Sequence, residues 1–369
     1  MKLGWITLAI AIVSAPAAHA GHRFLFEPSL QVNEVTDNNL NSSIEDPIGD
    51  RVQRITPGLA LRFDSPRWRL LSNYSMDHER YQKYSRFDND RARQRAEIGI
   101  EYRVAPRLTL FMNSAYVDTN TVADLNIDTG LAASRVQGRR LTFAPSATFR
   151  VSSRVIATAA ASSSVTNVVN GIGTRIENET LGLERRSTLR DRFSIDYGHS
   201  HIAFIGTTPQ TIDTHTLLGG WTHDFGLHDR FVFQSGPRFT NQTPSLDLSA
   251  SMTHAYRFSS VGLSFVRTQV TVIGYAGAVE TQSLQAHFTV TPTRRLSAYI
   301  APALVKSSQH QFDATVARMA VGARCTIAPL VDLEVAYNHD RQSGTIDPSR
   351  PDAKLSHSTL SIGFVTRAR

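Results

Sequence analysis

The chain has 369 residues, of which 41% are hydrophobic and 19% are charged, and its formal net charge is +7 at pH 7. Its single cysteine, Cys325, excludes an intrachain disulfide and a thiolate metal cluster. The longest uncharged stretch, residues 155–174, contains many serines, threonines and asparagines. It is too polar for a membrane helix, which needs ~20 predominantly apolar residues. A membrane protein made from this chain must therefore be a closed β-barrel.

Residues 1–20 have the three parts of a secretory signal. Lys2 supplies the positive start, residues 3–13 form the apolar centre, and Ala18 and Ala20 flank a small-residue cleavage site. We expect cleavage before Gly21, with an uncleaved anchor as the alternative. The mature chain, residues 21–369, is then one domain.

Behind this signal, tight turns alternate with longer polar loops. The turns lie near residues 66, 106, 153, 191, 229, 260, 294 and 329, and an alternating strand follows each of them. Such regular hairpins in an exported chain predict an all-β, antiparallel, up-and-down transmembrane β-barrel. We expect eighteen strands, beginning near residues 23, 51, 68, 91, 108, 138, 155, 176, 193, 215, 230, 246, 261, 281, 296, 314, 331 and 355.

Sixteen strands is the alternative count, because the strands near residues 155 and 176 have the weakest patterns. An even number places both termini on the side of the short turns, which is the periplasm in a bacterial outer membrane. The longer loops, such as residues 37–50, 118–134 and 340–353, then face outward.

Alternation assigns the two faces of each strand. Between residues 91 and 104, arginines, glutamates and one glycine occupy one face, while mostly apolar residues occupy the other. Residues 53–64, 317–327 and 331–338 show the same division. In a barrel the apolar face meets lipid and the charged face lines the lumen. Charge on the lipid face is expected to be nearly absent, and Cys325 falls on that face.

Prolines and aromatic residues add two further expectations. Pro28, Pro57, Pro145 and Pro302 lie mid-strand, where proline cannot donate to a ladder, so they predict bulges. Aromatic residues close to the short turns, such as Trp68, predict a girdle at the periplasmic membrane interface.

Residues 30–40, which end in a Thr-Asp-Asn element, precede the phrase Ile-Thr-Pro-Gly-Leu at residues 55–59. In these elements the chain resembles a group of outer-membrane β-barrel porins that are encoded with exopolysaccharide biosynthesis genes. The resemblance extends over the mature chain in the spacing of its strands and turns, and it implies a role in polysaccharide export. The C-terminus departs from the usual terminal aromatic, because five residues follow Phe364.

Catalytic chemistry is missing from the pattern. No nucleophile–base pairing or phosphate-binding glycine loop is present, so we expect no enzyme and no cofactor. His199 and His201 could share a metal, although loop-proximal, solvated histidines are the favoured interpretation, and we expect no metal site. The acidic loop with Asp37, Glu45, Asp46 and Asp50 is interpreted as solvated, with calcium or lipopolysaccharide binding as the alternative.

The candidate functional residues are charged side chains on the expected lumenal face. They are Arg54, Arg62, Arg69, Arg91, Arg93, Arg95, Glu97, Glu101, Arg103, Glu184, Arg186, Arg318, Arg324, Asp332 and Glu334. One hypothesis is a field that favours anionic solutes. The other is a set of cross-strand ion pairs that rigidify the wall, and the two are compatible.

The sequence thus supports three functions. The first is a passive conduit for an exported anionic polysaccharide, with outer-membrane lipid and lipopolysaccharide, the barrel-assembly machinery and periplasmic export components as partners. The second is an uptake porin for small solutes, which predicts an inward-folded loop, with residues 118–134 as the candidate. The third is a non-conducting structural or adhesive barrel. Nucleic acid is not an expected partner, because acids are interleaved with the arginines.

Overall fold

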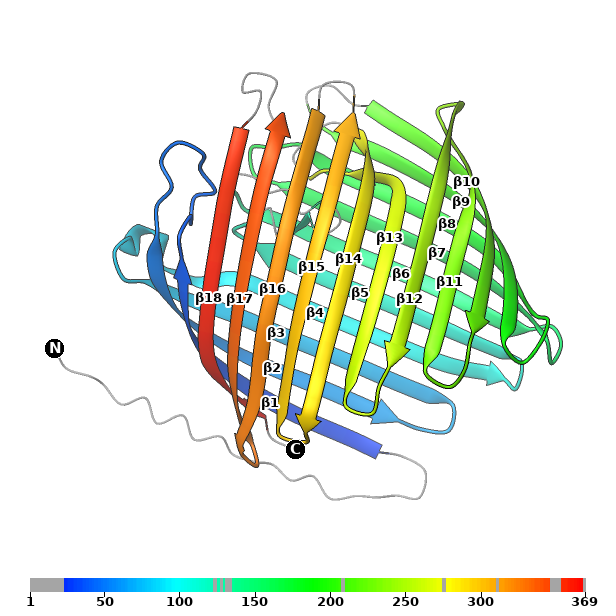
Figure 1. The fold of residues 1–369 in the computed structure, drawn as a ribbon, viewed down its shortest axis with the longest axis horizontal. Coiled ribbons are helices and arrows are strands. Elements are labelled where there is room, and N and C mark those ends of the chain that lie inside the picture. Colours follow the sequence, from blue (N-terminus) through cyan, green and yellow to red (C-terminus); the bar gives the residue numbers. More distant parts are fainter. Residues whose placement is uncertain are drawn as a thin grey trace.

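The computed structural model describes residues 23–121, 125–126, 129, 135–206, 210–273, 277–309, 312–345 and 353–367. The predicted signal sequence, residues 1–20, lies outside them. The described chain forms one closed sheet of eighteen antiparallel strands, in which β1 pairs with both β2 and β18 (Figure 1). The strands are β1 Arg23–Asp37, β2 Asp50–Asp64, β3 Trp68–Tyr81, β4 Asn89–Ala105, β5 Leu108–Thr119, β6 Gly138–Arg150, β7 Val155–Val168, β8 Gly173–Arg186, β9 Asp191–Ile205, β10 Gln210–Asp224, β11 Asp229–Thr240, β12 Thr243–Ala255, β13 Ser259–Thr271, β14 Ala278–Thr293, β15 Leu296–Gln309, β16 Phe312–Ala328, β17 Val331–Thr345 and β18 Ala353–Arg367.

The prediction of an eighteen-stranded up-and-down barrel is confirmed, and the sixteen-stranded alternative is wrong. Each strand pairs with its neighbours in sequence, because the short turns leave room only for antiparallel hairpins. A single short 3-10 helix, η1 (Ser85–Phe87), occurs among the described residues. None of the described helices is long and apolar enough to cross a membrane.

The eight even-to-odd connections, such as residues 65–67 between β2 and β3, form the short-turn end of the barrel. The opposite rim is called the loop end. β1 begins and β18 finishes at the short-turn end (Figure 1). The expectation that all connections at the loop end are long is wrong for at least one of them. β11 and β12 are joined by Asn241 and Gln242 alone, whose φ values of 46° and 69° suit a tight hairpin turn.

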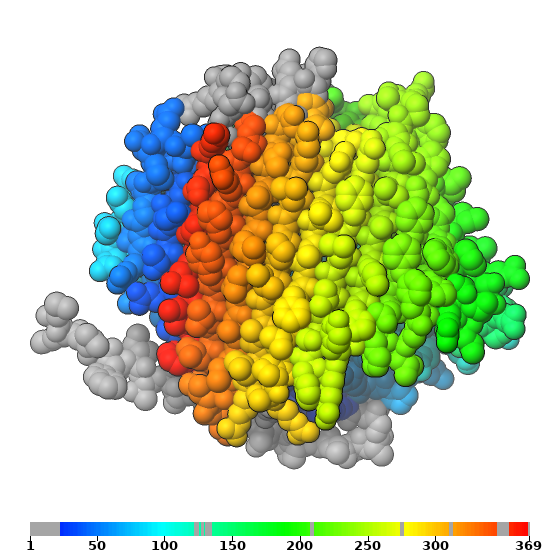
Figure 2. Space-filling model, in the orientation of Figure 1, coloured from blue at the N-terminus to red at the C-terminus, as the bar shows by residue number. Residues whose placement is uncertain are grey.

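The two faces of the sheet differ as the alternation predicts. Large apolar side chains such as Ile55, Ile98 and Leu284 are exposed on the outer wall, whereas Arg54, Asp77 and Glu79 lie on the inward face. Figure 2 shows that side chains cover the outer wall continuously over the strands in view. Charge is not absent from the outer face, however. Glu177, Glu179 and Asp213 share the outward row with Leu181 and Leu217, which corrects that expectation.

The expectation of bulges at the mid-strand prolines is wrong. The β1–β2 pairing continues in constant register through Pro28 and Pro57, and the pairings of Pro145 with Met112 and Pro302 with Met319 are equally regular. Pro57 has no ladder partner on β3, and Pro145 has none on β7, but the register of both ladders is the same before and after the proline. Each proline therefore removes local pairing but inserts no residue. The shifts in the described ladders lie elsewhere, for example between Thr326 and Ala328.

Aromatic side chains lie at the short-turn end of the outer wall. Trp68 and Tyr102 stack there with ring centroids 4.1 Å apart, and Phe149, Phe193 and Phe258 are exposed on the same rim. Rings with one apolar and one polar environment suit a membrane interface.

Candidate functional site

The barrel wall opens between β12 and β13 at the loop end. The β12–β13 ladder stops at the pair Leu248 and Arg267, whereas the β13–β14 ladder continues to Thr271 and Ala278. The last part of β13 and the first part of β14 therefore bend away from β12, while β14 stays paired with β15 as far as Glu280 and Ser308. This segment, residues 268–271 and 277–281 with the adjoining Val272 and Ile273, is called the inserted hairpin end.

One face of the inserted hairpin end packs on the inward face of β9 to β11. Ala278 belongs to the same alternating row as the lipid-facing Leu284, yet it is buried against Ile202, Phe204 and Ile212. Side chains of this row can contact the lumenal wall only if the segment bends into the barrel.

Polar contacts on the same face support this geometry. The Thr240 hydroxyl of β11 donates to Gln269 Oε1 at 2.7 Å, and Glu280 lies 3.5 Å from the Arg238 guanidinium. Arg238 is only 4% exposed and also pairs with Asp247. A buried arginine with two carboxylates anchors the hairpin by charge-assisted hydrogen bonds.

The opposite face of the inserted hairpin end packs on β15 and β16. Val279 is fully buried in a cluster with Val305 and Val316, and Thr281 shares a 3.2 Å hydrogen bond with Ser307. The segment is thus held between two parts of the wall. It occupies the lumen at the loop end on the side of β9 to β15.

The β5–β6 loop reaches the inserted hairpin end across the lumen. The backbone N–H of Ile273 donates to Asn126 Oδ1 at 2.7 Å, and Leu125 packs against Ile273. Arg140 holds the loop from β6 by donating to the Leu125 carbonyl at 2.8 Å. In the ring, β5 and β13 are separated by seven strands, so these contacts join distant parts of the wall. The described residues of the loop at 118–134 do fold inward.

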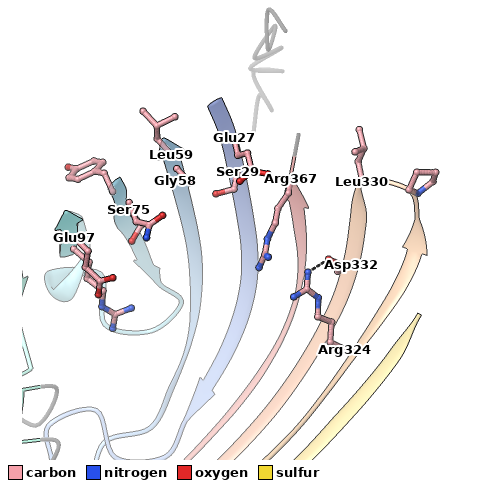
Figure 3. Close-up of a pocket in the computed structure, with 15 residues that line it drawn as sticks. Glu27, Ser29, Gly58, Leu59, Ser75, Glu97, Arg324, Leu330, Asp332 and Arg367 are labelled. Atoms are coloured by element: carbon pink, nitrogen blue, oxygen red, sulfur yellow. Dashed lines mark hydrogen bonds and ion pairs between the residues drawn. The ribbon is translucent and has the colours of Figure 1, made fainter. Parts of the chain in front are cut away.

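A path remains along β1 to β4 and β16 to β18. At the loop end, a cavity of about 410 Å³ is lined by Arg54, Glu79, Arg93, Arg318 and Asp340, among others. At the short-turn end, a second cavity of about 490 Å³ is lined by residues that include Arg95, Glu97, Arg324, Asp332 and Arg367 (Figure 3). Arg93 and Arg95 are consecutive inward residues of β4, so the two cavities follow each other along one side of the barrel.

Many of the candidate lumenal residues form cross-strand ion pairs. Arg54 lies 2.7 Å from Glu79 and 3.8 Å from Asp77, and Arg93 lies 3.6 Å from Asp77. Near the short-turn end, Arg62 and Arg69 share Asp64, and Arg69 also lies 3.3 Å from Glu101.

The same arrangement occurs on the other side of the path. Arg318 lies 2.8 Å from Asp340, while Arg324 pairs with Asp332 and lies 3.6 Å from Glu334. Figure 3 shows Arg324 and Asp332 joined on one side of the cavity and Glu97 on the other.

The remaining candidates are spread around the wall. Arg95 and Glu97 line the cavity near the short turns, and Arg91 lies at the loop end of β4. Arg103 lies near the short-turn end of β4, while Glu184 and Arg186 lie on β8, away from the two cavities.

Sequence reasoning missed several partners of these arginines. Asp77 and Glu79 are nearly buried on β3, Asp340 faces Arg318, and Arg135 contributes from the β5–β6 loop at 3.8 Å from Glu79. Asp77 and Glu79 are two residues apart within an alternating strand, which is the signal that could have identified them.

Comparison of the sequence with protein-family models and with curated proteins finds no match. Several solved barrels are similar in structure. OpdL of Pseudomonas aeruginosa has 12% identity and a TM-score of 0.51 over 94% of this chain and 99% of that chain. OpdO of the same organism has 10% identity and a TM-score of 0.51, over 93% and 97% of the two chains. OccAB4 of Acinetobacter baumannii has 9% identity and a TM-score of 0.50, over 95% and 99%. At these identities the likeness establishes a shared fold.

Proposed function

We propose that this protein is a bacterial outer-membrane channel through which small polar solutes diffuse, with its loop end outside the cell and its short turns in the periplasm. The apolar outer wall and the ion-paired interior support a membrane-spanning barrel with a wet lumen. The solved barrels of the same fold include OpdL, OpdO and OccAB4.

The observation that carries the proposal is the contact between Asn126 and Ile273 across the lumen. Together with the inserted hairpin end, it confines the outer half of the path to one side of the barrel. A cavity of about 410 Å³ accommodates a small molecule. An extended polysaccharide chain needs one open passage along the whole barrel, whereas the two inward segments narrow the outer half of the lumen. We therefore infer uptake of small solutes in preference to polymer export.

The charge around this path is nearly balanced. The cavity at the loop end has four arginines, Arg54, Arg93, Arg135 and Arg318, and three carboxylates, Asp37, Glu79 and Asp340. The cavity near the short turns has three of each sign. We therefore infer a weak preference for anions, because most arginines are committed to ion pairs with the wall.

Liposome swelling with neutral sugars of increasing size tests the proposal. Liposomes containing the purified barrel should swell in monosaccharides and disaccharides and should show no swelling in dextran. Rapid permeation of dextran would contradict a small-solute channel and favour the polymer conduit. Permeation of no sugar, with barrel folding verified by circular dichroism, would indicate a non-conducting barrel.

A further inference from the structure

The outer wall carries a polar patch on three adjacent strands. It consists of Arg175, Glu177 and Glu179 on β8, His199 and His201 on β9, and Asp213 and His215 on β10. These seven residues, here called the outer polar patch, belong to the outward row of each strand, together with the exposed Leu181, Tyr197 and Leu217. They do not face the channel.

The outer polar patch interrupts the apolar band that surrounds the barrel. On β6, five outward residues from Phe149 to Leu141 are apolar. On β8, only Leu183 and Leu181 are apolar before Glu179, whose side chain is 76% exposed. Charges on the lipid face of such barrels are unfavourable, by ~2–4 kcal/mol for arginine or lysine at the bilayer midplane and less toward the interfaces and for acids. Lipid is therefore a poor neighbour for this face.

The polar groups are partly satisfied within the patch. His201 Nδ1 lies 2.7 Å from Asp213, Arg175 lies 2.6 Å from Glu177, and the rings of His199 and His215 stack at 4.8 Å. Among the described residues no group of three or more side chains is arranged to hold a metal ion. His199 and His201 lie on the outward row of β9, close to its loop end at Ile205.

The arrangement of charge is self-complementary about β9. Counted from the short-turn ends of their strands, Glu177 and His215 are both nine residues up, and Arg175 and Asp213 are both eleven residues up. Rotation about a two-fold axis that is parallel to the barrel axis and passes beside β9 leaves the height of each residue unchanged. It places β8 of one copy opposite β10 of the other. It therefore brings Arg175 of one copy opposite Asp213 of the other, and Glu177 opposite His215.

The residues of β9 lie close to the same axis. The same two-fold operation makes His199 and His201 neighbours of their own counterparts near the axis. An isologous contact requires this kind of self-complementary surface.

From these observations we propose that the face formed by β8, β9 and β10 is the interface between two copies of this chain in the membrane. Each ion pair between Arg175 and Asp213 would occur twice, once on either side of the axis. Arg175, Glu177, Asp213 and His215 would then be removed from lipid and paired across the interface, while Glu179 lies at the level of Leu217.

Charge reversal tests the proposal with the full-length mature barrel. The wild-type protein, purified in mild detergent and analysed by light scattering and by cross-linking in native membranes, should be dimeric. Arg175→Asp and Asp213→Arg should each lose the dimer, because each places like charges opposite one another. The matched control is Lys306→Asp, an outward charge on β15 that pairs with Asp313 at 3.8 Å, and it should remain dimeric.

Mixing the two single variants gives the decisive result. Differently tagged Arg175→Asp and Asp213→Arg proteins should form a one-to-one heterodimer, because one interface pair is then restored with reversed sign and the other keeps its native sign. The double variant should regain the homodimer. A monomeric wild type, single variants that stay dimeric, or a mixture that does not associate would each overturn the proposal. In each case, lipid or a different protein would be left as the neighbour of the patch.

Discussion

The two sides of the lumen have the same alternating strand pattern, but their inward residues have different surroundings. Along β1 to β4 and β16 to β18, the inward residues are charged, paired across strands and exposed to two cavities. Along β9 to β15, the inward residues at the loop end are buried beneath the inserted hairpin end, as Ile202 and Val305 illustrate. Alternation decides which side chains point inward. The break in the β12–β13 ladder decides whether these inward side chains contact water or the inserted hairpin end.

The largest effect is expected from displacing the inserted hairpin end from the side of the lumen formed by β9 to β15. Ala278→Arg places a long cation among Ile202, Phe204 and Ile212, where a buried charge is strongly unfavourable. Expulsion of the hairpin should raise single-channel conductance several-fold in planar bilayers. Ala320→Arg is the matched substitution on the open side, between Arg318 and Gly322 on the inward row of β16, and it should lower conductance. Equal effects of the two variants would remove the distinction between the sides.

A smaller effect is expected from breaking an ion pair on the open side. Arg54→Gln removes the partner of Glu79, whose side chain is 6% exposed. Loss of the arginine leaves a carboxylate facing the path, so reversal potentials in a salt gradient should shift toward cations. Glu79 keeps the Tyr81 hydroxyl at 2.6 Å and Arg135 at 3.8 Å but loses its closest cation, so the free energy of unfolding should also fall by about 1–3 kcal/mol in urea titrations of the barrel in vesicles. Arg62→Gln, at a more exposed guanidinium, serves as the control and should change both quantities less.

The smallest effect is expected from weakening the contact between the two inward segments. Asn126→Ala removes one hydrogen bond to the Ile273 backbone, a net contribution of about 1 kcal/mol. The population of a displaced loop should therefore rise by a factor of about five. Single-channel recordings should show more frequent transitions to a higher conductance level. Unchanged current fluctuations would mean that the contact does not hold the loop.

Strand number and facing were predictable because side chains alternate with period two in every strand. Arg54, Arg93 and Arg318 were therefore placed on the inward face by sequence alone. The inserted hairpin end was not predicted, because a break in the β12–β13 ladder depends on contacts among distant strands. Its signal was present, since Arg267, Gln269 and Glu280 are polar residues on an otherwise apolar row. Glu177, Glu179 and Asp213 carried the same kind of signal for the outer polar patch.

The partners of the arginines were only partly predictable. Asp332 and Glu334 were identified from alternation in the strand next to Arg324. Asp77 and Glu79, which pair with Arg54, were missed. Asp340, which pairs with Arg318 in the same manner, was missed as well. Pairing needs the register between strands, and register follows from the closure of the whole barrel rather than from any one segment.

Disulfide trapping between the two inward segments tests the account most directly. On a Cys325→Ser background, Leu125→Cys and Ile273→Cys together place thiols on side chains that pack in the structure. A disulfide forms only when the two Cα atoms lie within about 7 Å. We predict that the barrel in membranes oxidises to an intramolecular disulfide and keeps its low conductance, while Leu125→Cys paired with Thr359→Cys of β18 does not cross-link. Free thiols at 125 and 273 in a folded barrel would contradict the inserted hairpin end and the small-solute path that depends on it.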